Sequence, residues 1–445
     1  MELLSPLRLR LFDPFRPITI DAVGGSPTRA PDPDTFATTA DARGDALPPG
    51  VAAPAATDDG RPARLPRGAR LAEDPRTLDA QRDVARANAR RAVGMMPSAP
   101  SDHPWVAANA DARKAIAAAG LPNDGAGVEI HVLMERDPIH GPDVTRAAAG
   151  PGSLTPNADA HLHPALLPKE GAPIATTLDG VIAQRVEHAA EFVDRAADEV
   201  AKLRQNLPPS ERVRVANLSV GTSAARLAEQ AARQIRDEGG DALLADINAR
   251  RAAEGLEPIS RDAQEELAAY LAPKLEAGLA ASPELDRARL RLGEEVRAAR
   301  AANIYTVAAA SNDGASPFTD AQERSVLADI DGLPLVGASR LAGGGEHNGA
   351  LTSPGAEYST IGIDVPVRLG DSLGGPPADG DGTSYAAPRA ASIVALMVGA
   401  NPDIRPDQID AILAQTAHDD PRTERDGVGY LDAAAAVIRA AELRN

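Results

Sequence analysis

The chain has 445 residues and a formal net charge of −18, and its length allows up to about three domains. Hydrophobic residues make up 43% of it, which is enough to form one large core. The acidic balance argues against binding to nucleic acid or to an anionic membrane surface. The chain has no cysteine, so disulfides and thiolate metal sites are excluded. We see no other dependable signature of a metal or cofactor and expect none.

The first ten residues lack the pattern of a secretory signal peptide, which is a basic segment followed by about 7–15 apolar residues. No window approaches the roughly 18 uninterrupted apolar residues that a membrane span needs. The sequence therefore predicts a protein without a membrane partner. We expect it to be cytoplasmic, or exported by a route that the sequence does not reveal.

Residues 1–125 are predicted to form an N-terminal extension. From about Gly24 to Leu71 the chain is rich in Pro, Ala, Asp, Gly and Thr with little periodicity, and such a stretch cannot bury enough apolar surface to offset the entropy of ordering. We expect partial disorder there, a polar helix at 76–94, and a helix at 107–119 that packs on the main domain. The extension is interpreted as a propeptide or as a targeting or partner-binding arm.

Residues 126–440 alternate apolar strand patterns with helical patterns, which indicates an α/β domain with a mainly parallel sheet flanked by helices. Strands are expected at 128–134, 160–163, 213–220, 304–310 and 333–338. Helices are expected at 178–203, after Ser384, at 406–417 and at 431–442. The block 222–302 is predicted to form about four helices. Within it, residues 222–285 are interpreted as an insertion. This insertion is expected to be either a surface for a partner protein or self-association, or a solvated lid.

One stretch carries most of the chemistry: Gly382-Thr383-Ser384-Tyr385-Ala386-Ala387-Pro388, followed by an apolar helical run. Ser384 is expected in the first turn of a buried helix, where free backbone N–H groups and the helix dipole stabilise negative charge. Alone, Gly-Thr-Ser is more often a helix cap than a nucleophile. The full run, however, resembles the nucleophile motif of the subtilisin-like serine proteases, the subtilases.

The resemblance extends to three further segments. Val307–Asn312 stands where subtilases carry the strand before the oxyanion-hole asparagine, which implies that Asn312 donates to the oxyanion beside the backbone N–H of Ser384. His140-Gly141-Pro142-Asp143-Val144 resembles the segment with the catalytic histidine and assigns that role to His140. Asn217–Gly221 resembles one wall of the substrate pocket, so Ser219, Val220 and Gly221, with Ala310 on the opposite wall, are expected to bind substrate.

The acid of the triad is where the pattern departs from the family, because the usual loop between acid and histidine is nearly absent. Glu135 follows the apolar strand directly and is our preferred acid, with Asp137 as the alternative. Strand parity would instead put Met134 where subtilases place their aspartate. Either acid could orient the imidazole of His140 and stabilise its charged form.

The resemblance implies a serine endopeptidase that hydrolyses peptide bonds of a protein or peptide substrate through Ser384, His140 and an acid. The irregular acid region, the serine at position 311 where the family usually has glycine, and the helical insertion leave a second reading open. In it the chain is a catalytically degenerate subtilase that binds a peptide or a partner protein.

Overall fold

The structure is a computed structural model that describes residues 102–135, 140–165, 174–237, 239–312, 318–342, 346–351, 354–367, 378–418 and 429–444. The expectations for residues 1–101, including the linker and the helix at 76–94, lie outside these ranges. Within the ranges, none of the helices combines the length and the apolar character that crossing a membrane would require.

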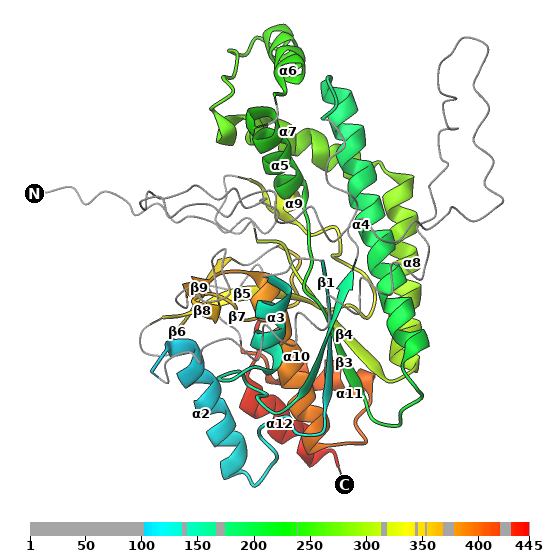
Figure 1. Cartoon of the computed structure of the whole chain (residues 1–445), viewed down its shortest axis with the longest axis vertical. Coiled ribbons are helices and arrows are strands. Elements are labelled where there is room, and N and C mark those ends of the chain that lie inside the picture. The colour runs from blue at the N-terminus through cyan, green and yellow to red at the C-terminus, as the bar shows by residue number, and fades with distance from the viewer. Residues whose placement is uncertain are drawn as a thin grey trace, which may run out of the picture. The chain divides into compact units, whose positions relative to one another are not determined.

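The described residues form an α/β fold around one sheet (Figure 1). Its parallel strands run in the order β10-β7-β5-β4-β3-β1-β2, and β6 pairs with β5 in the antiparallel sense. β8 and β9 form a separate antiparallel pair. The predicted parallel sheet is confirmed. The strands are β1 (Glu129–Glu135), β2 (Asp159–Ala165), β3 (Arg214–Leu218), β4 (Ile304–Ala309), β5 (Leu335–Ala342), β6 (Glu346–Leu351), β7 (Tyr358–Ile361), β8 (Val365–Val367), β9 (Ala378–Gly380) and β10 (Gly429–Tyr430).

The helical block after β3 consists of four helices, α5 to α8, as predicted. One of its breaks has a clear cause, because the hydroxyl of Ser282 accepts from the backbone N–H of Leu285 and Pro283 occupies the first helical position. The helices are α2 (Pro104–Ala118), α3 (His140–Ala149), α4 (Leu178–Asn206), α5 (Ala224–Asp237), α6 (Asp241–Ala253), α7 (Gln264–Ala280), α8 (Pro283–Ala301), α9 (Asp320–Glu323), α10 (Thr383–Ala400), α11 (Pro406–Thr416) and α12 (Ala433–Glu442).

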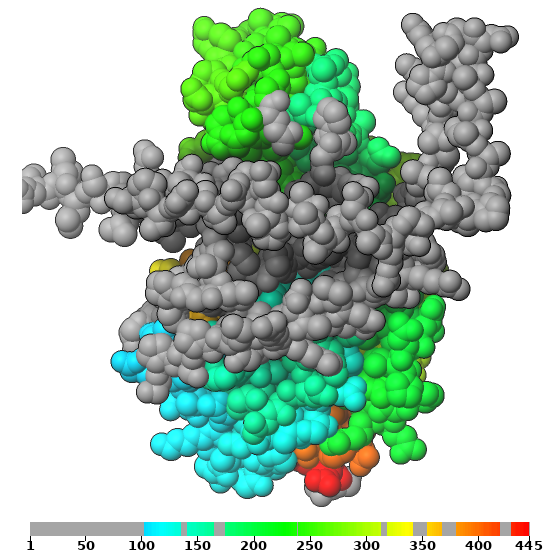
Figure 2. All heavy atoms as spheres, viewed as in Figure 1, coloured from blue at the N-terminus to red at the C-terminus, as the bar shows by residue number. Residues whose placement is uncertain are grey.

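The two faces of the sheet bury two separate cores. On one face α2, α3, α10, α11 and α12 pack against alternate strand residues such as Val132 and Met134. On the other face α4, α5, α7 and α8 pack against the intervening residues, for example Leu133 and Leu218. α4 runs along α8 beside the sheet (Figure 1). In Figure 2 the green atoms of α5 to α7 and the cyan atoms of α2 gather at opposite ends of the view.

The strand β4 and the helix α10 lie at the centre of the arrangement. Every residue of β4 is buried, which explains its uninterrupted apolar pattern. α10 is buried along nearly its whole length and contacts β1, β3, β4, β5 and β7. Because the sheet is parallel, the carboxyl ends of these strands lie at one edge, where side chains from distant parts of the chain can meet.

Candidate active site

Ser384 is the second residue of α10, so the helix begins one residue before it. Its side chain is buried, with 8% of the residue exposed. The N-cap is Gly382, and its side-chain-free Cα leaves room for the hydroxyl: a Cβ there would lie 3.1 Å from Ser384 Oγ. The first N–H groups of a helix have no partner within the helix, and Ser384 lies among them as the sequence predicts.

The backbone around Ser384 has an unusual hydrogen bond. In a regular helix the N–H of residue 388 would donate to the carbonyl of Ser384, but Pro388 has no N–H. That carbonyl instead accepts the hydroxyl of Ser219 at 3.0 Å. Ser219 Oγ in turn accepts from Asn217 Nδ2 at 2.6 Å. The segment after β3 is thereby tied directly to the residue that carries the candidate nucleophile.

Asn312 lies beside the start of α10, at the carboxyl end of β4. Its Oδ1 accepts from the backbone N–H of Thr383 at 2.7 Å and from the Thr383 hydroxyl at 2.8 Å. The backbone N–H can only donate, which identifies this end of the amide as oxygen. The Thr383 hydroxyl, which has one proton, also lies 2.7 Å from the carbonyl oxygen of Ala310. The amide of Asn312 and the Ser384 hydroxyl border the same glycine: a Cβ on Gly382 would be 3.6 Å from Asn312 Nδ2 and 3.1 Å from Ser384 Oγ. Such an N–H can donate to negative charge that develops beside Ser384.

His140 is the first residue of α3, and only 3% of it is exposed. Its Nδ1 lies 3.1 Å from the hydroxyl of Tyr385, the residue next to Ser384. The two rings meet edge to face, with centroids 5.2 Å apart and an interplanar angle of 82°. The structure therefore brings His140 to the start of α10 from far earlier in the chain.

The predicted acids are only partly described. Glu135 is the last residue of β1, and its backbone is in register with Ala165. Its side chain and the whole of Asp137 lie outside the described residues. Met134, before Glu135, is fully buried.

The predicted substrate-binding residues follow two neighbouring strands. Ser219, Val220 and Gly221 come directly after β3, and Ala310 comes directly after β4. The two segments approach so closely that a Cβ on Gly221 would lie 2.8 Å from the carbonyl oxygen of Ala310. Position 221 therefore requires glycine. Ser311, where the family usually has glycine, donates its hydroxyl to the carbonyl of Glu323 at 2.6 Å.

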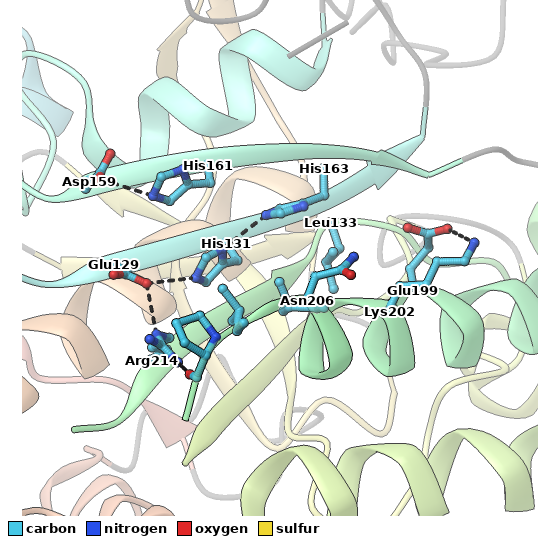
Figure 3. A pocket seen from close by; sticks show the side chains of 13 residues that line it. Glu129, His131, Leu133, Asp159, His161, His163, Glu199, Lys202, Asn206 and Arg214 are labelled. Carbon is cyan, nitrogen blue, oxygen red and sulfur yellow. Dashed lines mark hydrogen bonds and ion pairs between the residues drawn. The ribbon is translucent and has the colours of Figure 1, made fainter. Parts of the chain in front are cut away.

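A second polar region lies on the other face of the sheet, in a cavity of about 450 Å³ between β1, β2 and the end of α4 (Figure 3). His131 stacks on His161, and its Nδ1 lies 3.0 Å from Nε2 of His163. From the sequence these histidines were interpreted only as strand or loop residues. In the parallel pair β1 and β2, His131 is in register with His161, and His163 is two residues further along β2. Side chains two residues apart lie on the same face of a strand, and this spacing is the signal that could have grouped the three histidines.

Carboxylates surround this histidine cavity. His131 Nε2 lies 3.4 Å from Glu129, which also pairs with Arg214, and His161 Nε2 lies 3.1 Å from Asp159. Burial, together with the nearby His161, lowers the pKa of His131 to about 4 despite Glu129. Among the residues that the structure describes, no three His, Asp or Glu side chains are arranged to hold a metal ion.

Comparison with known proteins identifies the family. The model of the subtilase family (Peptidase S8) matches residues 178–431, more than half of the chain, a range that contains Asn312 and Ser384 and begins after His140. A search of curated protein sequences found no match.

Among solved structures, the chain is similar to a protease from Pseudoalteromonas arctica, with 17% identity, a TM-score of 0.42 and coverage of 77% of this chain and 95% of the other. It is similar to the MycP3 protease of the type VII (ESX-3) secretion system, with 18% identity, a TM-score of 0.40 and coverage of 74% and 87%. A chain of the subtilase cytotoxin SubAB shares 13% identity, with a TM-score of 0.42 and coverage of 75% and 94%. On the match of the family model, the chain belongs to the subtilase family of serine proteases, which act on proteins or peptides.

Proposed function

We propose that the protein is a serine endopeptidase in which Ser384 is the nucleophile, His140 the general base and Asn312 an oxyanion donor. The observation that carries the proposal is the position of Asn312: its Oδ1 accepts from the backbone N–H of Thr383, and its amide borders the same glycine, Gly382, as the Ser384 hydroxyl. The contact of His140 with Tyr385, the residue after Ser384, supports the same site.

In the proposed reaction Ser384 Oγ attacks the peptide carbonyl while its proton moves to His140 Nε2. The carbonyl oxygen becomes an oxyanion that accepts from Asn312 Nδ2 and from the backbone N–H of Ser384. The imidazolium then gives its proton to the leaving amine as the C–N bond breaks. Water hydrolyses the acyl-enzyme in the same manner and returns the proton to Ser384.

The third member of the triad stays the acid predicted from the sequence, Glu135 or alternatively Asp137. Glu135 ends β1 five residues before His140, so its backbone reaches the same edge of the sheet. We further propose that Ser219, Val220 and Gly221 line one side of the substrate site and Ala310 the other. The close approach of Gly221 to Ala310 supports this pairing.

We retain the division into an N-terminal extension to residue 125, a catalytic domain at 126–440 and an insertion at about 222–285. The insertion is proposed as a surface for a partner protein or for self-association.

Labelling with a fluorophosphonate tests the proposal, because such a probe reacts only with an activated serine. We expect purified protein to be labelled at Ser384, as located by peptide mass spectrometry, and to cleave an unfolded protein substrate. Ser384→Ala should abolish both. Ser392→Ala is the matched control, since Ser392 lies buried in the same helix and donates to the carbonyl of Ala148, so this variant should still be labelled. A wild-type protein that neither cleaves nor labels would leave the degenerate binding protein as the better reading.

A further inference from the structure

We propose that Ser311 is a positioning residue for the oxyanion donor Asn312, which follows it directly in the chain. The hydroxyl of Ser311 donates to the backbone carbonyl of Glu323 at 2.6 Å and thereby fixes the backbone from which the Asn312 side chain extends. The inference rests on the proposed serine endopeptidase. It assigns Ser311 a role in that reaction which is exerted only through its neighbour.

The segment after β4 is held between two elements. The backbone N–H of Ala310 donates to the carbonyl of Val336 on β5 at 3.1 Å. The carbonyl oxygen of Ala310 lies 2.7 Å from the hydroxyl of Thr383, the first residue of α10. Two residues later, Asn312 Oδ1 accepts from the backbone N–H of Thr383. Ser311 lies between these two contacts with α10, and its hydroxyl attaches the same segment to α9.

The side chain at position 311 suits this role. Only 3% of Ser311 is exposed, and because a carbonyl oxygen can only accept, the hydroxyl proton points to Glu323. Within the described ranges, positive φ angles outside glycine occur at Asn303, Asp329 and Asp364, so the backbone at position 311 is not strained by a side chain. The hydrogen bond of Ser311 therefore forms without a conformational cost to the segment.

The acceptor lies on a helix that is itself fixed. α9 begins with a capping box between Thr319 and Gln322. Directly after α9, the backbone N–H of Val326 donates to the carbonyl of Thr222 at 2.9 Å, at the start of the helical insertion. α9 also contacts α5 and α7 of that insertion (Figure 1). The insertion thus supports, through α9, the segment that carries the oxyanion donor.

The decisive variant is Ser311→Ala, which removes one oxygen and keeps the Cβ. Because the oxyanion develops only on the way to the tetrahedral intermediate, we expect kcat to fall about 10-fold and KM to stay within about twofold. Thr155→Val is the matched control: Thr155 is fully buried, and its hydroxyl also donates to a backbone carbonyl, that of Ala148, at 2.6 Å. This control should leave kcat and KM within about twofold. Thermal unfolding of both variants separates the result from loss of the fold.

A double-mutant cycle shows whether Ser311 acts through its neighbour. Asn312→Ala alone should lower kcat by about 10²–10³-fold, as the loss of one oxyanion donor does. In that background Ser311→Ala should lower kcat by less than about twofold more, since no donor is left to position. Additive losses would give Ser311 a general structural role and overturn the inference, as would an unchanged kcat in Ser311→Ala. In both cases the proposed function stands.

A further readout does not depend on activity. In protein labelled with ¹⁵N-asparagine, the side-chain amide signal of Asn312 is assigned by its loss in Asn312→Ala. We expect its hydrogens to exchange with solvent about 10-fold faster in Ser311→Ala than in the wild type or in Thr155→Val. An unchanged signal in Ser311→Ala overturns the inference. If the wild-type protein neither cleaves nor labels at Ser384, the proposed function fails, and the amide signal still decides whether Ser311 positions Asn312.

Discussion

Two buried histidines of the described residues, His131 and His140, lie on different faces of the sheet. His131, with His161 and His163, lies on β1 and β2 facing the α4 side of the sheet, in contact with carboxylates (Figure 3). His140 opens α3 on the other side and contacts the phenol that follows Ser384. Two acid–imidazole pairs, Glu129 with His131 and Asp159 with His161, thus line the cavity on the α4 side.

The difference teaches that an acid beside a histidine does not make a catalytic base. The second nitrogen of His131 meets another imidazole, and within the described residues the lining of its cavity contains neither serine nor threonine. Around Ser384, by contrast, the proposed oxyanion donor Asn312 follows β4 and the proposed base His140 opens α3. We therefore base the proposed site on the residues around Ser384 rather than on a carboxylate–histidine pair.

The largest expected effect separates the two groups directly. His140→Ala should lower kcat/KM for a peptide substrate by about 10³-fold or more, because the general base is lost. His163→Ala, the matched change in the cavity on the α4 side, should leave kcat/KM within about twofold. Steady-state kinetics on both variants checks this. Equal losses of activity would show that the two regions are coupled and that the separation drawn above is wrong.

A second test uses pH and concerns the stability of the α4 side. Since the pKa of His131 in the folded protein is about 4 and that of an unfolded histidine about 6.5, the unfolded state binds the proton first. The stability contribution is therefore complete above pH 6.5 and is lost as the pH falls toward 4, by roughly 3 kcal/mol at most. Urea unfolding at pH 7 and pH 4.5 should show a smaller loss for His131→Gln than for the wild type.

His418→Gln is the control for that experiment, because His418 also contacts a carboxylate, Asp432 at 2.8 Å, but is solvent-exposed. It should keep the wild-type pH dependence. A His131→Gln protein with an unchanged dependence would mean that other groups in the fold set the acid sensitivity.

The smallest expected effect concerns the hydrogen bond between the Ser219 hydroxyl and the backbone carbonyl of Ser384. Ser219→Ala leaves the buried carbonyl of Ser384 without its donor and should lower the free energy of unfolding by about 1–3 kcal/mol. Pro388→Ala restores an N–H that can reach the same carbonyl within the helix. In the double variant the loss should therefore be smaller than the sum of the two single losses. Additive losses in urea unfolding would contradict this account of the proline.

The elements that the sequence predicted well are those with strong local patterns. β4 is buried on both faces, and its continuous apolar run predicted a strand. The apolar residues after Ser384 predicted a buried helix in the same way. The strands β6 to β10 were not predicted. β8 has three residues and β10 two, which is too few for any periodicity, and the six residues of β6 begin with four that are not apolar. Their pairing is decided by neighbours distant in the chain.

In the candidate site, too, the residues within local motifs were predicted and a contact between distant residues was not. Asn312 and Ser384 were predicted because each lies within a local motif. Tyr385 occupies a position that the motif leaves open, and its contact joins residues 245 positions apart. No pattern in a single sequence reveals such a contact, because it depends on how α3 packs against α10.

The hydrogen bonds between Thr383 and Asn312 have a mechanical consequence. Both proposed oxyanion donors, the amide of Asn312 and the backbone N–H of Ser384, are attached to the first turn of α10. His140 lies on a different helix but contacts the same turn through the hydroxyl of Tyr385. We therefore expect a displacement of this turn to move the proposed nucleophile, oxyanion donors and base together.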